Sequence, residues 1–165
     1  MTTKKGPTAE EVFRRMHNTF QKWSDRVGDV SGAFEKFVPY FQDSREKWIM
    51  AGRTVDGKKF APLSPAYKAR KIKKWGRKPI LVASGKMLGA LTGGPGWSHK
   101  ISKKTLDIEL NIHYASYHQD GTSKMPQRNF FMTKEGTLNK LDYAQLLQLV
   151  EGELEKNSKA MGREL

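Results

Sequence analysis

An alternating segment in the second half of the chain constrains the fold most strongly. Leucine or isoleucine occupies every second position from 106 to 112, and polar residues occupy the positions between them and the flanking positions 105 and 113. Successive side chains of a strand point to opposite faces, so this pattern predicts a strand over 105–113 with one apolar face. Residues 97–101 can pair with it through a turn at 102–104. The resulting antiparallel hairpin needs other elements to cover its apolar face.

Helical patterns lie on both sides of this hairpin. Apolar residues recur at helical spacing over 8–28, 31–52 and 138–154, with Pro39 expected to kink or split the second helix. Shorter helices are predicted over 66–75, where Ser64 and Pro65 have the order of an N-terminal cap, and over 84–91. A short strand is expected over 129–132. The inward side of the last helix is expected to carry Leu141, Leu146, Leu149 and Val150, and residues from about Lys156 are expected to fray.

These elements predict an α+β fold, in which a small antiparallel sheet (the hairpin plus short strands) is covered by N-terminal and C-terminal helices. With 165 residues, the chain is expected to form a single domain. We divide it into a helical N-terminal region (1–52), a region with a loop, a basic helix and the hairpin (53–132), and a C-terminal helix with a frayed end (133–165). Its apolar stretches are too short for a membrane span or a secretory signal, so we expect a cytosolic protein.

Positive charge is concentrated in one part of the sequence. The formal net charge is +13, and 13 Lys or Arg but no Asp or Glu lie between Asp56 and Asp107, whereas the rest of the chain carries 17 basic and 17 acidic residues. Such a segment attracts nucleic acid, an acidic protein surface or lipid headgroups. Tyr67 and Trp75 interleave with the cations, as on nucleic-acid surfaces. The predicted interface or DNA-facing basic band consists of Lys68, Arg70, Lys71, Lys73, Lys74, Arg77 and Lys78.

Patterns that indicate catalysis are weak. The chain has no Cys, and His113 and His118 lack the additional ligands that a zinc site needs. Ser84 and Ser116 lack the surroundings of an activated nucleophile, and the glycines at 93–96 do not match a phosphate-binding loop. We therefore predict no catalytic residue, no cofactor and no metal. A small basic nuclease or toxin that depends on His113 or His118 is the catalytic alternative.

Four short motifs occur in a characteristic order: 57–67 (GKKFAPLSPAY), 80–88 (ILVASGKML), 114–121 (YASYHQDG) and 126–131 (PQRNFF). Their order and spacing resemble the phage virion morphogenesis family, which includes the tail-completion proteins of contractile-tailed and Mu-like phages. Phe60 stands where that family usually has Trp, and Asn129 where Pro is common. The positions that carry the resemblance are Phe60, Pro62, Leu63, Ser64, Tyr67, Leu81, Ser84, Gly85, Leu88, Tyr114, Ala115, His118, Gln119, Gly121, Pro126, Arg128 and Phe130.

The resemblance implies a structural protein of a virion and not an enzyme. Such a protein forms a ring, expected to be a hexamer, at the head-proximal end of the tail and helps to join tail to head. Its expected partners are further copies of itself, the tail terminator, the tail tube and head-neck proteins, and its location is the virion after assembly in the bacterial cytoplasm. Neck and head-completion proteins can share these motifs. The alternative is a DNA-binding or packaging-associated protein, with the basic band in contact with packaged DNA.

Overall fold

The computed structural model describes residue 25 and residues 28–162, and confirms the α+β class. The elements are α2 (Ser31–Met50), α3 (Pro65–Trp75), α4 (Lys86–Leu91), β1 (Trp97–Ile101), β2 (Leu106–Leu110), α5 (Ala115–Asp120) and α6 (Lys140–Gly162). The helix predicted over 8–28 lies outside the described residues. None of the described helices is both long and apolar enough to cross a membrane.

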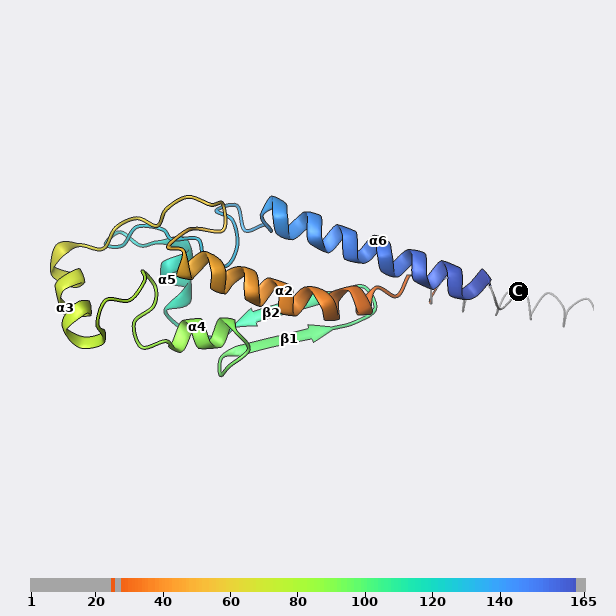
Figure 1. The fold of residues 1–165 in the computed structure, drawn as a ribbon, viewed down its shortest axis with the longest axis horizontal. Coiled ribbons are helices and arrows are strands. Elements are labelled where there is room, and N and C mark those ends of the chain that lie inside the picture. The colour runs from red at the N-terminus through yellow and green to blue at the C-terminus, as the bar shows by residue number, and fades with distance from the viewer. Residues whose placement is uncertain (1–24, 26–27, 163–165) are drawn as a thin grey trace, which may run out of the picture.

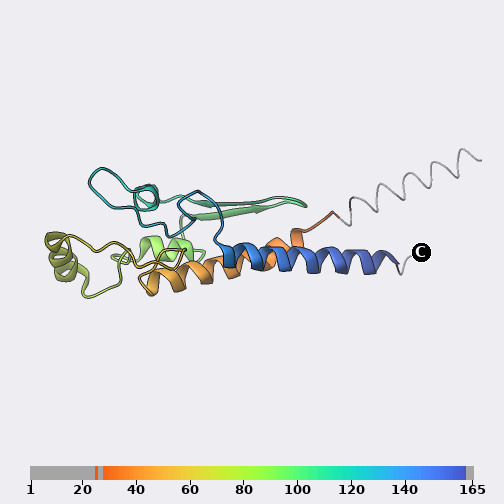
Figure 2. The ribbon, with the colours of Figure 1, turned by 90° about the horizontal axis from the view of Figure 1, so that it is seen from above.

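Two long helices, α2 and α6, lie side by side, the hairpin and α4 pack on α2, and α3 lies at one end of the molecule (Figures 1 and 2). Pro39 does not split α2, which is continuous from residue 31 to residue 50. Pro39 and Glu35 are both exposed, so water can hydrate the Glu35 carbonyl that would otherwise accept a hydrogen bond from residue 39. The buried side of α2 carries Phe37 and Phe41.

The predicted hairpin forms, with Trp97 opposite Leu110 and Ile101 opposite Leu106. Its second strand covers 106–110 and is shorter than the predicted 105–113, because residues 113 and 114 turn into α5. Its turn is closed by Ser102, whose backbone N–H donates to the Thr105 carbonyl at 2.9 Å. No further strand joins it in the described part of the chain.

The predicted strand over 129–132 is therefore wrong. Gln119 makes the hydrogen bonds that a neighbouring strand would have made. Its side-chain oxygen accepts from the Phe131 and Met132 N–H groups, and its side-chain nitrogen donates to the Met132 carbonyl at 3.0 Å. The Phe131 carbonyl accepts from Arg45 Nε and the Asn129 carbonyl from the Val55 N–H, so this largely buried backbone is satisfied without a ladder of strands.

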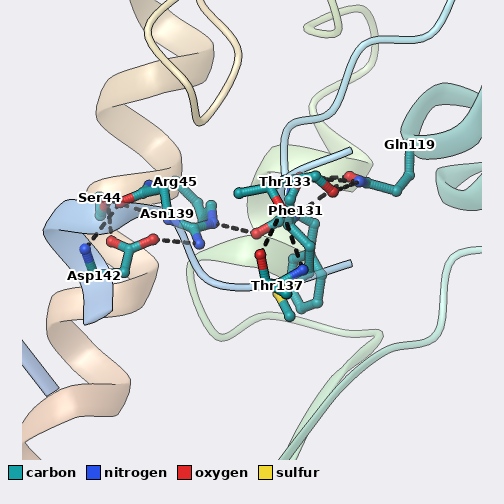
Figure 3. A network of polar contacts seen from close by, with 9 residues as sticks. Ser44, Arg45, Gln119, Phe131, Thr133, Thr137, Asn139 and Asp142 are labelled. Carbon is teal, nitrogen blue, oxygen red and sulfur yellow. Dashed lines mark hydrogen bonds and ion pairs between the residues drawn. The ribbon is translucent and has the colours of Figure 1, made fainter. Parts of the chain in front are cut away.

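A network around Arg45 fixes the rotation of α6 against α2 (Figure 3). Arg45 and Asp142 are fully buried, and Arg45 Nη2 lies 2.6 Å from Asp142 Oδ2. Arg45 Nε donates to the Phe131 carbonyl at 2.7 Å, and the Asn139 side chain caps α6 by accepting from the Asp142 N–H at 2.9 Å.

This rotation corrects the predicted inward side of α6. Asp142 and Glu153 are the buried residues there, whereas Leu141 is 63% exposed and Leu146, Leu149 and Val150 are only partly buried. The predicted fraying from Lys156 is also wrong, because α6 continues to Gly162. Asn157 Nδ2 holds this end by donating to the Asp29 carbonyl at 2.7 Å.

The hydrophobic core lies at the end of α2 that contacts α4 and the loops around α5. Its buried side chains come from α2, α4, α5 and the loops at 60, 82 and 130. They are Ile49, Phe60, Val82, Met87, Leu91, Ala115 and Phe130.

Candidate functional site: the α3 lobe and the hollow beside it

Helix α3 begins where the sequence predicts. The Ser64 hydroxyl accepts from the Tyr67 N–H at 3.4 Å, and Pro65 occupies the first turn, where its missing N–H costs nothing. The helix ends at Gly76, whose positive φ of +76° suits a residue without a side chain. We call residues 65–79, which comprise α3 and the loop after it, the α3 lobe.

Six of the seven cations in the predicted basic band are exposed. Successive helical residues are rotated by about 100°, so Arg70, Lys73 and Lys74 fall on one side of α3. We call this the outward side of α3, and it also carries Ala66 and Ala69. Lys68 is exposed on another side of the helix, and Arg77 and Lys78 are exposed in the loop that follows.

Lys71 does not belong to an exposed band, because its side chain is buried, with only 4% of the residue accessible. Its Nζ donates to the carbonyls of Lys78 at 2.7 Å and Pro79 at 2.5 Å. Burial, and to a smaller extent repulsion from Lys78, lowers the pKa of Lys71. Lys71 therefore acts as a clamp that folds the loop back onto α3 and holds Arg77 and Lys78 in the lobe.

A hollow of about 420 Å³ separates α3 from the body of the molecule. Tyr67 and Trp75 face it from α3, and Met87 lines it from α4. All four sequence motifs contribute to its wall. The first motif contributes Leu63 and Tyr67, and the second contributes residues that include Leu81, Ser84 and Gly85. The third contributes Tyr114 and His118, and the fourth contributes Arg128.

Arg128 connects three of these motifs. Its side chain is almost completely buried and donates from Nε to the Ala61 carbonyl at 3.0 Å and from Nη2 to the Pro62 carbonyl at 3.2 Å. Its backbone N–H donates to the His118 carbonyl at 2.7 Å. Burial lowers the pKa of Arg128, and burial together with the nearby Arg128 charge lowers the pKa of His118. Arg128 thus links three segments of the chain by hydrogen bonds from its side chain and its backbone.

The remaining motif residues serve packing and backbone geometry. Phe60, Ala115 and Phe130 belong to the core, and Leu88 packs against it. Pro62 and Pro126 line a second hollow on the α5 side of α3. Gly85 has φ +89° and Gly121 has φ +78°. A Cβ atom at Gly121 would lie 2.8 Å from the Gln127 nitrogen, so this position requires glycine for space as well as for conformation.

The two histidines of the third motif are not arranged as ligands. The rings of Tyr114 and His118 meet edge to face with centroids 6.2 Å apart, and the His113 and Tyr114 rings meet edge to face with centroids 5.1 Å apart. His118 Nδ1 is buried without a hydrogen-bond partner. In residue 25 and residues 28–162, no three His, Cys, Asp or Glu side chains gather as a metal site would require.

Sequence reasoning missed three features of this region. The clamp role of Lys71 could not be distinguished from the neighbouring lysines. Leu81, which lines the hollow, has a left-handed backbone with φ 70°, and nothing in its residue type indicates this strained conformation. The link from Arg128 to residues 61 and 62 joins segments 66 or more residues apart.

Comparisons with known proteins gave no further guide to the site. No family model, curated protein or solved structure matches this chain.

Proposed function

We propose that this protein is a structural subunit of a tailed-phage virion, which forms a ring at the tail-completion or neck position and helps to join the tail to the head. The observation that carries the proposal is the convergence of the four motifs that resemble the virion morphogenesis family. They all contribute to the wall of one hollow, and Arg128 and Gln119 connect three of them through hydrogen bonds to the backbone of neighbouring segments. The motif residues thus have the roles of a scaffold.

An apolar stripe on α6 supports assembly with further copies. Tyr143, Leu147, Val150 and Leu154 recur at intervals of four, three and four residues, which is the spacing of a helix-packing seam. Tyr143 is 60% exposed and Leu147 is 44% exposed, although both are large and apolar. A second copy that packed on this stripe would remove these side chains from water, and repetition of the contact around an axis would close a ring.

Electron microscopy of particles assembled without this protein tests the proposed role. We expect filled heads and full-length tails to accumulate separately, and joined particles to return when the wild-type chain is supplied. Normal virions in its absence would refute the role. Tails of abnormal length would place the protein in tail-length control instead.

Two variants of α6 test the proposed ring contact. Leu147→Lys places a charge in the apolar stripe and is expected to abolish both the ring and the rescue of joining. Gln148→Lys, at the adjacent exposed position, is the matched control and should keep both. Equal ring formation by the two variants, measured by light scattering on a sizing column, would exclude the stripe as the contact.

A further inference from the structure

The outward side of α3 is basic and free of bulky residues. It carries Arg70, Lys73 and Lys74 together with Ala66 and Ala69, all of them exposed. In both ribbon views α3 lies at the end of the molecule opposite the C-terminal end of α6 (Figures 1 and 2). A projecting helix with short side chains between its cations can approach a large flat or grooved partner closely.

A second copy of this chain would bring no net negative charge to the outward side of α3. Outside residues 57–106 the sequence carries 17 basic and 17 acidic residues, so it has no net negative charge to offset the 13 cations within that range. The hollows on both sides of α3 are also lined without any Asp or Glu. Both observations favour a separate polyanion as the partner of this side.

We propose that the outward side of α3 binds the phosphate backbone of double-stranded DNA without reading its sequence. The Arg70 guanidinium lies 5.9 Å from the Tyr67 ring centroid, and Lys74 Nζ lies 4.6 Å from the centroid of the partly buried Trp75 ring. Cations of the lobe thus already occupy positions beside both rings, so the lobe does not offer a row of free rings for stacking on unpaired bases. The outward side has no Asn or Gln, the side chains that pair with adenine edges, and most of its cations are lysines, which bind phosphate as point charges.

The Lys71 clamp holds the loop against a different side of α3. It folds residues 77–79 back on the helix, where Arg77 lines a hollow together with Lys68 and Ile72. Arg77 therefore adds to the positive charge of the α3 lobe but not to the outward side. The proposal does not depend on the virion role, because it rests only on the charge and geometry of the α3 lobe.

Fluorescence anisotropy with a labelled DNA duplex of mixed sequence, at 50 to 300 mM salt, tests this proposal on the full-length protein. Each phosphate contact contributes about −0.9 to the slope of log Kobs against log salt concentration. Lys73→Glu/Lys74→Glu should therefore reduce the magnitude of the slope by about 2, and the affinity at 50 mM salt on the order of a hundredfold. A second duplex of unrelated sequence should bind equally well.

The matched control is Lys103→Glu/Lys104→Glu, which changes the net charge by the same amount in the exposed hairpin turn. It should lose far less affinity, and circular dichroism should show that both variants are folded. Equal losses in the two variants would refute the assignment to α3, because the effect would then come from net charge alone. Absence of duplex binding, tighter binding of a single strand, or preferential binding of poly-glutamate would also overturn the proposal.

Discussion

Removal of Asp142 is expected to destabilise the protein more than loss of any exposed ion pair. Asp142→Ala leaves the Arg45 guanidinium fully buried without its counter-charge. Two of its other contacts remain, the hydrogen bond to the Phe131 carbonyl and the position 3.8 Å from the Phe41 ring centroid. An unpaired buried charge costs about 3–5 kcal/mol of unfolding free energy, and a typical domain has only about 5–15 kcal/mol.

Two further variants separate this cost from the loss of a side chain. Arg45→Met/Asp142→Leu removes both charges and should recover most of the loss, because a well-packed apolar pair can replace a buried ion pair at little cost. Asp43→Ala breaks the Lys47–Asp43 pair on the exposed side of α2, and is expected to cost less than about 1 kcal/mol.

Urea unfolding followed by tryptophan fluorescence measures all of these differences. The reasoning would be refuted if Asp142→Ala cost no more than Asp43→Ala. The single variants Arg45→Met and Asp142→Leu complete the comparison. The reasoning would also fail if the double variant were no more stable than the summed losses of these two predict, since the two charges would then not be coupled.

Three other changes test separate parts of the structure. Phe130→Ala should cost about 3–5 kcal/mol in the same urea assay, because Phe130 is 1% exposed in the core; a loss under 1 kcal/mol would contradict that packing. Gly121→Ala should lower the melting temperature, because it introduces a Cβ 2.8 Å from the Gln127 nitrogen at a residue with positive φ. Gly152→Ala is the control, since no atom lies near its Cβ position on α6, and it should raise stability by about 0.5–1 kcal/mol. Equal effects of the two variants would exclude a steric role for Gly121. The pKa of His118 is lowered in the fold, so the unfolded state binds the proton more readily and stability should decrease as pH falls below about 6.5. His118→Gln should make the urea midpoint less dependent on pH between about pH 7 and pH 5. An unchanged profile would show that His118 does not contribute.

The sequence by itself determined the elements whose signals are local. The hairpin follows from alternation over a few residues, and the start of α3 follows from Ser64 and Pro65, because a side chain that caps a helix lies within three residues of its partner. Concentration of charge in 57–106 is likewise a property of the chain itself. The motifs could be recognised in order, but their meeting around one hollow could not be derived from any of them.

Tertiary structure decided the features in which residues far apart in the sequence meet. The rotation of α6 depends on an ion pair between positions 97 residues apart, so amphipathic spacing alone placed Leu141 on the wrong side. Gln119 replaced the strand expected beside residues 129–132, because a side-chain amide can satisfy the same backbone groups. Lys71 is buried and does not belong to the basic surface, because two carbonyls in the loop after α3 accept hydrogen bonds from its amine. Local patterns record which groups can be buried, whereas only the folded chain fixes which partners they find.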